Sequence, residues 1–160
     1  MFVVYTDEEK KQLIDVGKKS KKHIEADSKK IDVGKLDIKA LKSMGALKRY
    51  LEGEEVCREG DKGHEMFIIL QGSVSIIVNS VEVAVLDVGS FFGEMSLLDG
   101  LPRSATVVAK EDLIALAIGT SNFDKVITME PNLAVKIMTT LSKRVRMQNE
   151  LIVTLTGEEE

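Results

Sequence analysis

The chain has 160 residues, 44% of them hydrophobic, and a formal net charge of −4 at pH 7. This length suits one compact domain, and the acidic balance gives no general attraction to nucleic-acid phosphates, so direct nucleic-acid binding is not expected. No apolar run approaches the roughly 18 residues of a membrane span, and the N-terminal residues lack the pattern of a secretory signal, so we expect a cytoplasmic protein without membrane contact. One cysteine, Cys57, and two histidines provide no internal disulfide and no metal cluster of zinc-site spacing.

Residues 1–45 have helical character, and we assign no function to them. The basic stretch GKKSKKHIEADSKK within them contains acidic residues, and it fits a solvated helix face better than a patch for an anionic surface. Residues 46–118 contain short apolar runs that are rich in Val and Ile and are interrupted by Gly, Asp, Asn and Ser. Such runs predict an antiparallel sandwich or barrel, with Cys57 as a strand residue.

Residues 120–155 are predicted to be helical, with a restart at Pro131, a residue that suits a first helical position. The last helix carries residues at alternating spacings of four and three, which is the seam of a coiled coil: Ala134, Met138, Leu141, Val145, Gln148, Ile152 and Leu155. This helix either packs only on its own domain or also pairs with a second copy. The single polar seam member, Gln148, favours a homodimer because such residues fix register. Residues 156–160 form an acidic tail.

The most informative stretch is FGEMSLLDGLPRSATV, residues 92–107. A buried phosphate needs main-chain N–H groups at the start of a helical turn and an arginine to bind its oxygens. The residues after Glu94 can form this turn, Arg103 can supply the charge, and Ser104 and Ala105 are small enough for a phosphate to approach the main chain. A carboxylate would repel the phosphate unless it bound a hydroxyl, so Glu94 suggests a ribose. The alternative is a structural ion pair between Glu94 and Arg103.

Phe92, Gly93 and Glu94, followed after eight residues by Arg103-Ser104-Ala105, resemble the phosphate-binding cassette of cyclic nucleotide-binding domains. This family includes catabolite activator proteins, protein kinase A regulatory subunits and cyclic nucleotide-gated channels. The flanking segments GEEVCREGDKGHEMFIILQGSV and LSKRVRMQNELIVTL resemble the family's early strands and its C-terminal helix. The resemblance covers residues 46–155 and implies a mainly β fold with flanking helices (α+β). The expected architecture is an antiparallel β-roll, or jelly-roll barrel, with N-terminal helices and a long C-terminal helix.

The resemblance also implies a regulatory ligand, cAMP or cGMP, and no metal. Glu94 would accept a hydrogen bond from the ribose 2′-hydroxyl and Arg103 would bind the cyclic phosphate, while Leu97 falls at the family's apolar hinge. The residues expected to bind the ligand are Phe92, Gly93, Glu94, Met95, Ser96, Arg103, Ser104, Ala105, Gln148 and Asn149. In the family a threonine directly after the arginine favours cGMP. The corresponding Ser104 also occurs in cAMP binders, so the sequence predicts cAMP over cGMP.

The chain lacks the helix-turn-helix that follows this region in catabolite activators, so its output, such as an effector protein, is not specified. Three classes of function are considered: a cyclic nucleotide sensor, a domain of the same fold that binds no nucleotide and serves protein interaction, and an enzyme. The sensor is favoured because the Glu and the Arg of the cassette are both present. We expect no enzyme activity, because the stretch contains no nucleophile with a base, no metal cluster and no carboxylate pair.

Overall fold

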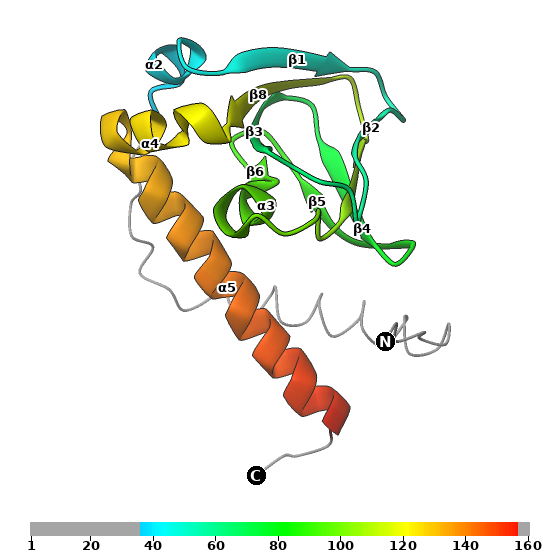
Figure 1. Cartoon of the computed structure of the whole chain (residues 1–160). Coiled ribbons are helices and arrows are strands. Elements are labelled where there is room, and N and C mark those ends of the chain that lie inside the picture. Colours follow the sequence, from blue (N-terminus) through cyan, green and yellow to red (C-terminus); the bar gives the residue numbers. More distant parts are fainter. Residues whose placement is uncertain (1–35, 157–160) are drawn as a thin grey trace. The chain divides into compact units, whose positions relative to one another are not determined.

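The computed structural model describes residues 36–156 (Figure 1). The predicted N-terminal segment 1–45 therefore lies mostly outside the described residues, as does nearly all of the predicted acidic tail 156–160. The chain divides into two compact units, and the first of them is Lys35–Ala134. The described part of the second is 135–156, which belongs to one long helix.

The first unit contains eight strands in two four-stranded antiparallel sheets. One sheet has the order β1-β8-β3-β6 and the other the order β2-β7-β4-β5. The strands are β1 (Ala46–Tyr50), β2 (Glu55–Cys57), β3 (Glu65–Gln71), β4 (Val74–Val78), β5 (Val81–Leu86), β6 (Phe91–Phe92), β7 (Thr106–Ala109) and β8 (Leu113–Gly119). This architecture confirms the predicted β-roll with flanking helices.

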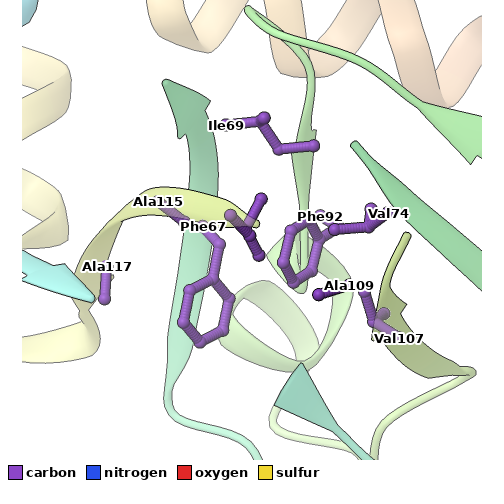
Figure 2. Packing of buried hydrophobic residues seen from close by; sticks show 9 residues of the cluster. Phe67, Ile69, Val74, Phe92, Val107, Ala109, Ala115 and Ala117 are labelled. Atoms are coloured by element: carbon purple, nitrogen blue, oxygen red, sulfur yellow. The ribbon is translucent and has the colours of Figure 1, made fainter. Parts of the chain in front are cut away.

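The main hydrophobic core consists of side chains from both sheets. Figure 2 shows Phe67, Ala115 and Phe92 of the first sheet gathered with Val74 and Val107 of the second. The rings of Phe67 and Phe92 stack with centroids 4.9 Å apart and an interplanar angle of 14°. The two residues are directly paired across β3 and β6, so the stack includes Phe92, the first residue of the predicted cassette.

The central strands β3 and β8 are buried on both faces. Because side chains alternate along a strand, Met66 and Ile68 point away from the core that contains Phe67, and both are nevertheless at most 1% exposed. This outer face is an apolar layer that includes the fully buried Leu116 and Ile118 of β8. Helix α4 (Thr120–Met129) contacts β8. These contacts explain why β3 is a continuous apolar run and not an alternating one.

Two further helices border the first unit. The short helix α2 (Ile38–Lys42) begins after Asp37, whose side chain accepts a hydrogen bond from the Ala40 N–H. The Asp37 N–H donates to Glu130 Oε2 at 3.3 Å, which links α2 to the end of α4. Helix α5 (Pro131–Thr156) begins at Pro131, as the sequence predicts.

Candidate functional site

The cassette begins with a tight turn into the short helix α3 (Glu94–Asp99). Gly93 precedes this helix with φ of 78°, a left-handed conformation that residues with a Cβ rarely adopt. The helix ends at Gly100, also left-handed, whose N–H donates to the Ser96 carbonyl oxygen at 3.0 Å. The helical turn predicted after Glu94 is therefore confirmed, and its two ends are set by glycines.

Arg103 is held in place by its main chain and by its side chain. Its N–H donates to the Asp61 carbonyl oxygen at 2.7 Å, and its own carbonyl oxygen accepts from the Gly60 N–H at 2.9 Å. The guanidinium Nη1 donates to the Gly93 carbonyl oxygen at 3.0 Å. The residue is only 7% exposed, and its Cζ lies 5.8 Å from the centroid of the Phe67 ring. A buried cation is therefore bonded to Gly93, the residue that precedes α3.

Two glycines leave the space that the guanidinium fills. A Cβ at Gly63 would lie 2.2 Å from Arg103 Nε and 2.4 Å from Cζ, although the φ of Gly63 is not left-handed. A Cβ at Gly93 would lie 2.5 Å from Nη1 and 2.9 Å from the Glu65 carbonyl oxygen. The sequence interpretation missed Gly63. The GDKG turn was visible, but nothing local indicated that its second glycine faces an arginine forty positions away.

The remaining predicted cassette residues differ in exposure. Glu94 is 1% exposed, and Ser96 and the predicted hinge residue Leu97 are also buried. Met95 is 39% exposed, and its sulfur accepts a hydrogen bond from the Ser104 hydroxyl at 3.7 Å. Phe92 is buried in the core, and Ala105 is half-buried. The fold thus brings Gly93 against Arg103 and Met95 against Ser104.

The predicted residues of α5 belong to the second compact unit and are described by themselves. Gln148 and Asn149 are both exposed, so their contact with a purine stays a prediction. In the predicted seam, Met138, Val145 and Ile152 are 61%, 54% and 57% exposed, while Leu141 is half-buried. An apolar stripe at seven-residue spacing is therefore open to solvent along this helix.

Cys57 ends strand β2, as predicted, and is a half-buried free thiol. Burial raises the pKa of the Cys57 thiol above its ordinary value, while the neighbouring charge of Arg103 acts in the opposite direction. The thiol borders a cavity of about 450 Å³, whose wall includes Arg103.

Comparison with known proteins places this geometry in a family. Residues 47–130 match the family "Cyclic nucleotide-binding domain", and the chain belongs to it. It is 41% identical over 83 residues to a cyclic nucleotide-gated potassium channel of Mesorhizobium japonicum, covering 51% of this chain and 22% of the channel. It is 40% identical over 65 residues to a cGMP-dependent protein kinase of Plasmodium berghei, covering 41% of this chain and 8% of the kinase.

A solved structure supports the same assignment. The catabolite activator protein of Thermus thermophilus superimposes with a TM-score of 0.68 and 28% sequence identity, over 74% of this chain and 58% of the activator. The described fold and the family match agree that residues 47–130 form a cyclic nucleotide-binding sensor domain, which is a regulatory module. The chain spans less than a quarter of the length of the channel and of the kinase.

Among the helices within 36–156, none is long and apolar enough to cross a membrane. The same part of the chain holds no group of three or more His, Cys, Asp or Glu side chains placed to bind a metal ion.

Proposed function

We propose that the cassette from Phe92 to Ala105 binds a cyclic nucleotide through its phosphate and its ribose. The observation that carries this proposal is the buried Arg103 guanidinium, which donates a hydrogen bond to the carbonyl oxygen of Gly93, the residue before α3. An arginine there meets the phosphate with a planar fork of donors, and the main-chain N–H groups at the start of the turn add further donors. Glu94, buried at the first position of α3, is the proposed acceptor for the ribose 2′-hydroxyl.

We propose cAMP as the preferred nucleotide over cGMP. The residue after Arg103 is a serine, and its hydroxyl is directed to the Met95 sulfur within the cassette. This contact leaves the hydroxyl less available to a guanine. The kinase relative is named for cGMP, so cGMP is the competing ligand. Substitution of Ser104 by alanine would lower cGMP affinity if the hydroxyl bound guanine, and would leave cAMP affinity unchanged.

We propose that residues 46–155 act as one sensor, in which Leu97 serves as the hinge and α5 transmits the signal. Gln148 and Asn149 are the proposed contacts to the purine. The exposed stripe of Met138, Val145 and Ile152 is the proposed seam of a homodimer, with Leu141 and Gln148 between them. The proposed output is regulation of an effector protein by binding, without catalysis by this domain. A free thiol and no disulfide agree with a cytoplasmic location, which we also propose.

Calorimetric titration with cAMP and cGMP tests the proposal directly. We expect micromolar or tighter binding of cAMP and weaker binding of cGMP, with no continuing heat from turnover. Folded protein that binds neither nucleotide would assign the chain to the family members that keep the fold without the ligand. Equal or tighter binding of cGMP would overturn the preference alone.

A further inference from the structure

The loop between β2 and β3, residues 58–64, holds Arg103 in place. Its main chain bonds that of Arg103 twice, through the Gly60 N–H at 2.9 Å and the Asp61 carbonyl oxygen at 2.7 Å. Gly63 of the same loop is buried and leaves the space that the guanidinium fills. The position of Arg103 therefore depends on the position of this loop.

Glu59 joins the loop to two other segments of the β-roll. Its N–H donates to Thr106 Oγ1 at 3.0 Å, and its carboxylate Oε2 accepts from the Asn79 N–H at 2.9 Å. Thr106 begins β7, and Asn79 lies in the turn between β4 and β5. Glu59 directly precedes Gly60, so its two bonds hold the part of the loop that bonds to Arg103.

The turn that Glu59 bonds has a defined shape. Strands β4 and β5 are paired up to Val78 and Val81, which leaves Asn79 and Ser80 as the two residues of the turn. Their φ angles are 48° and 66°, and left-handed backbone at both positions is what a type I′ hairpin requires. Such a turn presents the Asn79 N–H at a fixed place, where the carboxylate of Glu59 accepts it.

We propose that Glu59 is a positioning residue for Arg103. Its carboxylate ties the β2–β3 loop to the β4–β5 turn and so sets where the guanidinium meets a phosphate. A charge-assisted hydrogen bond weakens steeply when its donor moves or turns, so a small shift of the loop lowers the affinity. The negative charge of Glu59 by itself disfavours a phosphate nearby, so positioning and charge predict opposite effects of removing it. The effect on affinity rests on the function proposed for the cassette.

The first experiment compares two substitutions of Glu59 by calorimetric titration of the full chain with cAMP. Glu59→Ala should weaken binding about three- to tenfold, although it removes a negative charge. Glu59→Gln should stay within about twofold of the original affinity, because its amide oxygen can still accept from the Asn79 N–H. Binding by Glu59→Ala that is as tight as in the original chain, or tighter, would overturn the proposal. A loss in Glu59→Gln as large as in Glu59→Ala would also overturn it.

Glu111→Ala is the matched control for charge and stability. The hydroxyl of the buried Ser73 donates to Glu111 Oε1 at 3.0 Å, so this carboxylate also joins two segments. The main chain of Arg103 is bonded to Gly60 and Asp61 instead. We expect the melting temperature of Glu111→Ala to fall while its cAMP affinity stays the same. An equal loss of affinity in Glu111→Ala and Glu59→Ala would refute a positioning role.

Amide hydrogen exchange of the nucleotide-free chain tests the positioning without a ligand. The reporters are the N–H groups of Arg103 and Gly60, which bond Arg103 to the loop, and the amides of β8 report opening of the whole unit. Glu59→Ala should accelerate exchange at both reporters about tenfold or more and leave β8 unchanged, whereas Glu59→Gln should change neither. Unchanged exchange at the reporters would overturn the proposal. Accelerated exchange in a chain that binds neither cAMP nor cGMP would uphold it and refute the function proposed for the cassette.

Discussion

The Arg103 guanidinium donates a hydrogen bond to the Gly93 carbonyl oxygen at 3.0 Å, which joins the two ends of the cassette. The same guanidinium fills the space that a Cβ at Gly93 would occupy. The position of the charge and the left-handed turn before α3 therefore depend on each other. We expect a substitution at either residue to lower the affinity of the site for a phosphate group.

Substitution of Arg103 by alanine should abolish tight binding of cAMP without unfolding the chain. The change deletes charge-assisted hydrogen bonds to the phosphate and leaves a buried anion unpaired, at a cost of about 2–5 kcal/mol, or roughly thirty-fold to several thousand-fold in affinity. Arg103→Lys should restore part of the loss, because an ammonium keeps the charge without the planar fork. Calorimetry measures both affinities. A folded Arg103→Ala protein with original cAMP affinity would falsify the assignment.

Substitution of Glu94 by glutamine should weaken cAMP binding less, by about 1–1.5 kcal/mol or roughly five- to tenfold, because an amide oxygen still accepts from a hydroxyl. The matched ligand is 2′-deoxy-cAMP, whose affinity should hardly change because it lacks the hydroxyl. If Glu94 instead serves only the folded structure, both ligands should lose affinity in the same proportion. The melting temperature of the variant separates these outcomes.

Substitution of Gly63 by alanine should lower nucleotide affinity and also lower stability somewhat, because a buried side chain must move. The new Cβ would overlap Arg103 from Cδ to Cζ, so the guanidinium shifts from its bond to Gly93 and the phosphate contact weakens about three- to tenfold. Gly119→Ala is the control, since its Cβ would meet neighbours only at 3.8 Å and beyond and its φ is −83°. Equal cAMP affinity in the two variants would show that Gly63 does not position Arg103.

A charge in the exposed stripe of α5 should separate the proposed homodimer. Val145→Glu would place a carboxylate in an apolar seam, which costs several kcal/mol when the carboxylate is unpaired, on the order of the stability of a small dimer. Ser142→Glu adds the same charge at an exposed position outside the seam and should leave the dimer intact. Sedimentation measures the assembly. An unmodified chain that sediments as a monomer at micromolar concentration, with and without nucleotide, would contradict the dimer.

The Cys57 thiol should react slowly with N-ethylmaleimide until the pH is well above the ordinary thiol pKa. Burial raises the pKa of Cys57 in the folded chain, and only the thiolate is a strong nucleophile. The unfolded chain ionises first, so a rising pH through this range also removes some folding stability. The alkylation rate of Cys57 should be lower in native than in denatured protein. The two rates should become similar at higher pH. A native rate that levels off at a lower pH than the denatured rate would contradict this expectation.

Features that depend on local chemistry could be predicted from the amino-acid sequence. The apolar runs of residues 46–118 form strands because β-branched residues favour extended backbone, and α5 begins at Pro131 because a proline lacks the N–H that a first helical position leaves unused. The cassette was recognisable from Phe92-Gly93-Glu94, followed after eight residues by Arg103-Ser104-Ala105, together with its flanking segments. The predicted helical turn is present as α3.

Contacts between residues far apart in the chain could not be predicted from the sequence. Gly63 and Arg103 are brought together because the main chain of Arg103 bonds to the turn at Gly60 and Asp61, while β3 continues from that turn into its pairing with β6. The same arrangement places the Phe67 ring beside the guanidinium. Periodicity and backbone preference describe neighbours along the chain, whereas these contacts depend on main-chain hydrogen bonds that join Arg103 to Gly60 and Asp61 far along the chain. No local pattern specifies such bonds.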